Sequence, residues 1–153
     1  ICKSLDNECY HLCDISDKAG LIASNLYESP FEYCDVIICS PFATLRGPRG
    51  SGMIFYRSEL STKIDGAVFP GHQGGPHNHT ISAMATSLKM AKTNQFIGYQ
   101  NRCIQNAKTM ENLLIDKYKN NINIKIDGTT VHIQGLNDMD VLYNTLNQTN
   151  INI

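Results

Sequence analysis

The sequence predicts an α/β domain that is followed by the start of a separate α+β unit. Three observations support this prediction. Apolar runs such as "CDVIICS" (34–40) have the unbroken hydrophobic character of strands buried in a sheet. From about residue 80, apolar side chains recur at helical spacing over a long segment. After residue 120, isoleucines alternate with polar residues before an Asp-Gly pair, which indicates a β-hairpin.

The composition is that of a globular protein. Hydrophobic residues make up 42% of the 153 residues, which is enough for a core and excludes wholesale disorder. The formal net charge is -1 and there is no basic stripe, so nucleic acid is not an expected partner. No apolar run is long enough to span a membrane. The six cysteines form no CxxC pair and most lie among apolar residues, which favours a reducing compartment, cytoplasmic or mitochondrial.

The first strand is expected over residues 9–15, a short apolar run that contains Asp14 near its end. A carboxylate would then stand at the carboxyl end of a strand. The next segment, "SDKAGLIASNLY", reads as a short helical or irregular link, which Ser16 or Asp17 is able to cap.

Two further strands are expected over 34–40 and 52–57, separated by the turn "TLRGPRG". The first of them is apolar throughout, so we expect it to be covered on both faces of its sheet. Residues 63–79 are dense in glycine, proline and histidine and are expected to form a loop.

A long helical pattern begins at about Thr80. One face of it carries apolar residues at spacings of three and four: Cys103, Ala107, Met110, Leu114 and Tyr118. Gly98 interrupts the pattern, which indicates a bend or a boundary between two helices. A hairpin with its turn at Asp127-Gly128 follows, then a helix over 137–150 and the start of a strand at 151–153.

The pattern therefore divides the chain into a first unit, 1–100, which includes the start of the long helix, and a second unit, 101–153. The chain begins at Ile1 rather than at a methionine, so we expect it to be a piece of a longer protein.

Two features of the first unit suggest a binding site. Asp14 stands at a strand end, where ligands bind in α/β sheets, and the alternative is a helix cap or a surface carboxylate. Gly74 and Gly75 would let backbone N–H groups approach an anion just before a helix, which favours phosphate. The alternative is an ordinary glycine-rich connection.

Other polar residues are less informative. His72, His77 and His79 share one loop, but no carboxylate partner or HExxH pattern accompanies them, so no metal site is expected. Arg46 and Arg49 flank Gly47-Pro48, where they would pair with an acidic ligand or fix the turn.

Four segments taken in order reveal a family resemblance: "CDISDKAGLIAS", "SPFEYCDVIICS", "TLRGPRGSGMIFYR" and "AVFPGHQGGPHNHTISAMATSLK". Together they resemble serine hydroxymethyltransferase. The resemblance covers nearly all of the chain and weakens after about residue 100. It implies a pyridoxal 5'-phosphate (PLP)-dependent transferase of fold type I, in which 1–100 is the later part of the large domain and 101–153 begins the small α+β domain. The family works as a dimer and transfers the one-carbon unit of serine to tetrahydrofolate, leaving glycine.

The resemblance also implies roles for individual residues. Asp14 would pair with the pyridinium nitrogen of the cofactor and keep the ring an electron sink. Asp17 stands where the family has a histidine beside the cofactor, and its charge should weaken cofactor binding. Gly74 and Gly75 match a loop that reaches the cofactor phosphate of the neighbouring subunit. Arg46, like Arg49, matches an arginine of the family's turn.

The cofactor lysine of the family has no counterpart. Its position is Ala43, and the preceding histidine position is Phe42. Alanine cannot form the Schiff base through which such enzymes hold PLP and release product, so we expect no catalytic residue here. Lys18 follows Asp14 closely, but its family counterpart does not bind the cofactor.

Our first hypothesis is therefore a catalytically impaired family member with a structural or regulatory role. It would form a homodimer, or a hetero-oligomer with an active paralog, and PLP, serine, glycine and folate are the ligands that the resemblance implies. The second is an active hydroxymethyltransferase that uses a different lysine. The third is a non-enzymatic binder of PLP, folate or nucleic acid, and the neutral charge and the lack of interleaved aromatics argue against nucleic acid.

Overall fold

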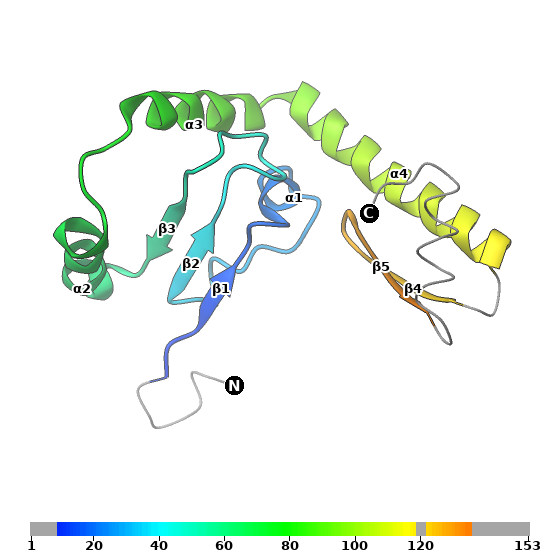
Figure 1. Ribbon diagram of the computed structural model, residues 1–153, viewed down its shortest axis with the longest axis horizontal. Coiled ribbons are helices and arrows are strands. Elements are labelled where there is room, and N and C mark those ends of the chain that lie inside the picture. The colour runs from blue at the N-terminus through cyan, green and yellow to red at the C-terminus, as the bar shows by residue number, and fades with distance from the viewer. Residues whose placement is uncertain (1–8, 119–121, 136–153) are drawn as a thin grey trace. The chain divides into compact units, whose positions relative to one another are not determined.

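The computed structural model describes residues 9–118 and 122–135 (Figure 1). Contacts between Cα atoms divide the chain into two compact units, Ile1–Gln100 and Asn101–Ile153.

The first unit contains a three-stranded sheet in the order β1-β2-β3. Strands β1 (Leu12–Asp14) and β2 (Val36–Cys39) are parallel, and β3 (Met53–Tyr56) is antiparallel to β2, as the arrowheads in Figure 1 show. The three strands predicted from the apolar runs are confirmed. Asp14 is the last residue of β1, so the predicted carboxylate at a strand end is also confirmed.

Strand β2 is more deeply buried on one face of the sheet than on the other within the described part of the chain. Side chains alternate between the two faces of a strand. In β2, Ile37 and Cys39 are buried, whereas Val36 and Ile38 are half-buried. The prediction that this strand is covered on both faces is therefore wrong for the residues described, and the side chain of Leu12 on β1 is 59% exposed.

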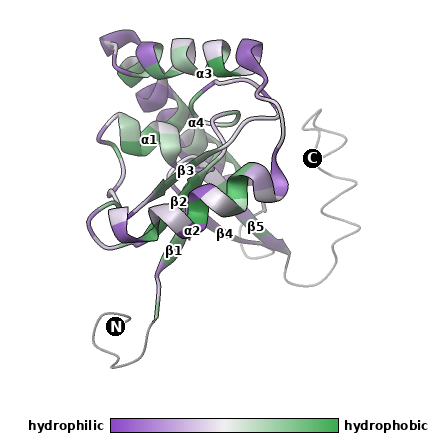
Figure 2. Cartoon of the chain, turned by 90° about the vertical axis from the view of Figure 1, so that its left-hand side faces the viewer, coloured by the Kyte–Doolittle hydropathy of each residue, from purple (hydrophilic) through white to green (hydrophobic). Residues whose placement is uncertain are grey.

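The core of the first unit lies between the sheet and helix α1 (Ala19–Ala23), which is coloured as hydrophobic in Figure 2. Its buried members come from both layers and from the helices that follow: Ile15, Ala19, Cys34, Ile37, Cys39, Leu45, Ala91 and Phe96. The predicted cap of α1 is wrong. The N-cap residue is Lys18, without a side-chain hydrogen bond. Ser16 instead bonds to Asp14.

The segment predicted as a loop over 63–79 begins inside a helix, so that prediction is wrong for residues 63–66. A 3-10 turn η2 (Ser58–Leu60) leads into α2 (Ser61–Gly66) and a π-helical turn η3 (Ala67–His72). Gly66 has φ -65° and ψ -34°, which is ordinary helical backbone. Phe69, inside η3, has φ -134° and ψ 126°, which is extended backbone, so regular helix does not continue through the glycine- and proline-rich part.

Two helices follow, α3 (Asn78–Ala91) and α4 (Asn94–Tyr118). The break between them lies at residues 92–93, so the predicted interruption at Gly98 is wrong, because Gly98 is inside α4. Thr93 explains the break, since its hydroxyl accepts a hydrogen bond from Phe96 N at 3.3 Å, as an N-cap does.

The predicted apolar face of α4 is confirmed where the structure describes it. Ala107 and Leu114 are buried, and Cys103 and Met110 are half-buried. The side chain of Tyr118 lies outside the described residues.

The second unit also contains the predicted hairpin. Strands β4 (Ile122–Asp127) and β5 (Thr130–Gly135) are antiparallel, with Ile124 opposite Ile133. Gly128 in the connecting turn has φ 65°, a conformation that glycine adopts without strain. The helix predicted over 137–150 and the strand predicted at 151–153 lie outside the described residues. No helix in the described ranges is long and apolar enough to cross a membrane.

Candidate functional site

Asp14 is exposed, and one of its two carboxylate oxygens is held by Ser16. The backbone N–H of Ser16 donates to Asp14 Oδ1 at 2.9 Å, and the Ser16 hydroxyl donates to the same oxygen at 2.6 Å. These two hydrogen bonds, the hydroxyl first, lower the pKa of Asp14 below its ordinary value. The carboxylate is therefore ionised at neutral pH.

Ser16 also links the end of β1 to the segment that follows β2. Ser40 N donates to Ser16 Oγ at 2.9 Å, and Thr44 Oγ1 donates to the Ser16 carbonyl at 3.2 Å. Ala43 lies between these two contacts and is exposed. The structure thus brings Asp14 and the segment around Ala43 together through one serine.

The turn around residue 43 is held by groups on either side of it. Gly20 N donates to Thr44 Oγ1 at 2.9 Å, and Gln100 Nε2 donates to the Thr44 carbonyl at 2.8 Å. Gln100 is only 1% exposed, so this hydrogen bond is shielded from water. Gly47 N donates to the Pro41 carbonyl at 2.8 Å and closes the turn. None of these contacts requires a particular side chain at position 43.

The two arginines of the turn stack on aromatic rings. The guanidinium carbon of Arg49 lies 3.9 Å from the centroid of Phe42, and that of Arg46 lies 4.9 Å from the centroid of Tyr99. Neither arginine has a carboxylate partner among the residues that the structure describes. Each arginine therefore makes a cation–π contact, Arg49 with Phe42 in the turn and Arg46 with Tyr99 on α4.

Gly74 and Gly75 line a cavity of about 500 Å³ that also includes residues 50–52 and the start of α3. The N-cap residue of α3 is His77, which makes no side-chain cap hydrogen bond. Asp14, Asp17 and Arg46 do not line this cavity. Within this chain, Gly74 and Gly75 therefore do not share a cavity with Asp14.

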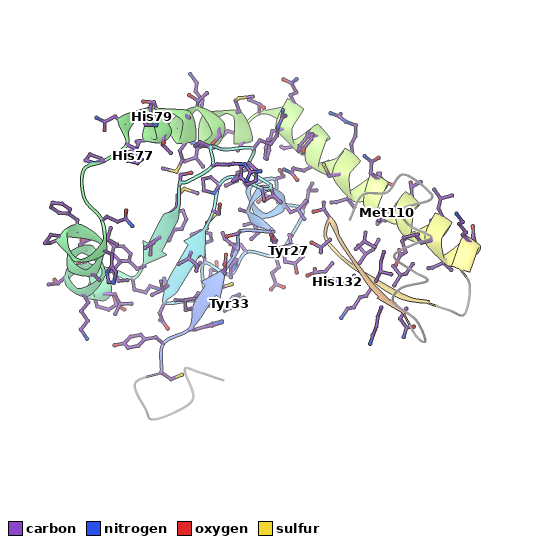
Figure 3. The ribbon with its side chains drawn as sticks, in the orientation of Figure 1. Tyr27, Tyr33, His77, His79, Met110 and His132 are labelled. Carbon is purple, nitrogen blue, oxygen red and sulfur yellow. The ribbon has the colours of Figure 1, made fainter. Side chains whose placement is uncertain are left out.

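The three histidines lie near Gly74 and Gly75. His77 and His79 stack with their ring centroids 5.7 Å apart at the start of α3 (Figure 3). His72 Nδ1 lies 2.8 Å from the Ala67 carbonyl instead. No group of three His, Cys, Asp or Glu residues within the described ranges is arranged to hold a metal ion.

Two further residues singled out in the sequence lie at the end of β1 and the start of α1. Asp17 is exposed. Lys18 Nζ lies 5.6 Å from the centroid of the Tyr27 ring, where its charge is stabilised by the aromatic face. Lys18 is therefore engaged in a contact that does not involve the turn around Ala43.

Sequence reasoning missed Ser16 and Gln100 as parts of this site. Ser16 follows a strand-end aspartate by two residues, a spacing at which aspartate often accepts hydrogen bonds from the local backbone. Gln100 is a polar residue in line with Phe96, Cys103 and Ala107 on one helix face. A lone amide on an apolar stripe is a signal for a buried hydrogen bond.

Comparison with known proteins identifies the family. A family model for serine hydroxymethyltransferase matches residues 1–146. The mitochondrial serine hydroxymethyltransferase of Schizosaccharomyces pombe is 45% identical over 139 residues, which cover 81% of this chain and 28% of that protein. The serine hydroxymethyltransferase of Bombyx mori is 41% identical over 141 residues (83% and 30%). The cytosolic enzyme of Candida albicans is 42% identical over 140 residues (81% and 29%).

The chain therefore belongs to the serine hydroxymethyltransferase family. It spans less than a third of the length of these three relatives. The family depends on PLP, and the residues of this site suit that cofactor in one respect only. The ionised carboxylate of Asp14 suits a protonated ring nitrogen. Ala43 offers no amine for covalent attachment.

Proposed function

We propose that the protein containing this chain is a catalytically impaired serine hydroxymethyltransferase-like protein of PLP fold type I. The observation that carries this proposal is Ala43. It is exposed, next to Thr44, which hydrogen bonds from Gly20 and Gln100 hold in place, and it stands at the position that the family fills with the cofactor lysine. A methyl group supplies neither the Schiff base nor the exchange with a substrate amine.

The surroundings of Ala43 support the same proposal. Phe42 replaces a histidine with a side chain that cannot transfer a proton, and it stacks on Arg49. Asp17, three residues after Asp14, adds a negative charge that would weaken the binding of an anionic cofactor. Two adjacent substitutions, at positions 42 and 43, thus remove polar groups, while the hydrogen bonds of Ser16 and Thr44 nearby are present.

We propose a structural or regulatory role for such a protein in one-carbon metabolism. Gly74 and Gly75 support an assembly role, because they line a cavity separate from the Asp14 network and would serve the site of a second subunit. The partner would be a second copy or an active paralog. In this proposal, residues 1–100 belong to the large domain and 101–153 to the small one. The cytosolic and mitochondrial relatives favour one of those two compartments.

A second candidate is an active hydroxymethyltransferase that holds PLP through a different lysine. The retained Asp14 carboxylate with its lowered pKa favours it, since this group would keep a bound cofactor ring protonated. The relatives named above carry the name of the active enzyme.

One experiment separates the two candidates. The full chain is incubated with PLP, reduced with borohydride and digested, and any pyridoxyl group is located by peptide mass mapping. The first proposal expects no single lysine to be modified stoichiometrically. One lysine modified to completion, with an absorbance band that shifts when serine is added, would establish the second candidate instead.

A further inference from the structure

Ser16 has a hydroxyl group whose orientation is determined by its neighbours. Ser40 N–H is only a donor, so the Ser16 oxygen must accept from it at 2.9 Å. The hydroxyl proton is then directed to Asp14 Oδ1 at 2.6 Å. Because the Ser40 backbone follows strand β2 directly, the strand holds the hydroxyl in this orientation.

The two oxygens of Asp14 consequently differ. Oδ1 accepts two hydrogen bonds, from the backbone N–H and from the hydroxyl of Ser16. Oδ2 accepts none from the described part of the chain. The carboxylate thus presents one saturated and one open oxygen, and the open oxygen keeps its capacity for a further charge-assisted hydrogen bond.

We infer that Ser16 is a positioning residue that holds Asp14 as an ionised carboxylate with one open oxygen for the N–H of a protonated aromatic ring. A protonated pyridine ring has a single N–H donor, which matches the single open oxygen of Asp14. The inference rests on the proposed family site, but it does not depend on position 43. The lowered pKa of Asp14 agrees with it.

The probe for this inference is 4′-deoxypyridoxine 5′-phosphate. It keeps the pyridine ring and the phosphate but has no aldehyde, so its binding is independent of any lysine. The pKa of Asp14 is measured by NMR titration of its ¹³C-labelled carboxylate, and the dissociation constant of the probe by calorimetry. Ser16→Ala removes the hydroxyl, Ser16→Thr restores one, and Ser29→Ala is a control at an exposed serine elsewhere.

The inference expects Ser16→Ala to raise the pKa of Asp14 towards its ordinary value and to weaken probe binding by roughly tenfold, as loss of a hydrogen bond to a charged group does. Ser16→Thr should restore both properties, and Ser29→Ala should change neither. An unchanged Asp14 pKa, unchanged probe binding in Ser16→Ala, or no probe binding by the unaltered chain would each overturn it. The borohydride result is independent of these outcomes, so failure of the inference and failure of the proposed function are distinguishable.

Discussion

The guanidinium carbon of Arg49 lies 3.9 Å from the centroid of the Phe42 ring, so these two residues form a cation–π pair across the turn. Phe42 is 40% exposed, which means that burial alone does not hold its ring. The ring of Phe42 is therefore held in part by its contact with Arg49.

This pair predicts a measurable coupling. Phe42→Leu should lower the free energy of unfolding by about 0.5–1 kcal/mol, the usual size of an exposed cation–π contact, whereas Phe42→Tyr should keep most of it. A double-mutant cycle with Arg49→Met, measured by urea denaturation, isolates the coupling energy. A coupling energy of zero within error would show that the stack contributes nothing.

The second prediction concerns position 43, where alanine has no amine to react with PLP. Ala43 is exposed and the turn around it is held by Thr44, Gly20 and Gln100, so a longer side chain at position 43 should fit without unfolding the turn. Ala43→Lys should therefore give a pyridoxyl adduct at position 43 after incubation with PLP and borohydride reduction. Ala43→Met is the matched control, similar in length but without an amine. If Ala43→Lys shows no more label than Ala43→Met, the turn does not place a lysine where it reacts with PLP.

The strands and the hairpin were predictable because their apolar patterns are unambiguous. The run in β2 and the alternation in β4 leave few alternatives to a strand. The one-sided burial of β2 was not predictable, because an apolar side chain looks the same in a sequence whether or not another layer covers it. The link between Asp14 and the segment that contains Ala43 was not predicted, and the structure shows that Ser16 makes it.

Two errors in the helices have physical causes. Gly98 looked like an interruption, yet glycine inside a helix costs only about 1 kcal/mol, which packing elsewhere in the helix offsets. The real break depends on Thr93, whose role as a cap is visible only in its hydrogen bond to Phe96 N. Gln100 was missed because its partner, the Thr44 carbonyl, is 56 residues away and backbone carbonyls carry no sequence signal.

Gly20 provides a stringent test of the packing beneath the turn. A methyl group at Gly20 would overlap the Thr44 carbonyl and the Gln100 side chain, the two groups that hold the turn. Gly20→Ala should therefore destabilise the protein by about 1–3 kcal/mol or more. Gly66→Ala is the matched control, because no atom lies near that site and its φ is helical, and it should stabilise by about 0.5–1 kcal/mol. Equal effects of the two substitutions in urea unfolding would contradict the described packing.

Cys39 at the end of β2 gives the last prediction. Its side chain is 3% exposed, and burial, with the negative charge of Asp14 as a smaller cause, raises the pKa of its thiol from 9.0 to about 11. The thiolate is the reactive form, so at pH 8 a rise of this size lowers its population about a hundredfold. Alkylation by iodoacetamide, followed by peptide mass mapping, should therefore be at least about a hundredfold slower at Cys39 than at the exposed Cys9. Asp14→Asn should speed the reaction at Cys39 and leave Cys9 unchanged, because it removes the nearby charge. If Asp14→Asn does not change the rate at Cys39, the carboxylate and the strand end are not coupled as the structure describes.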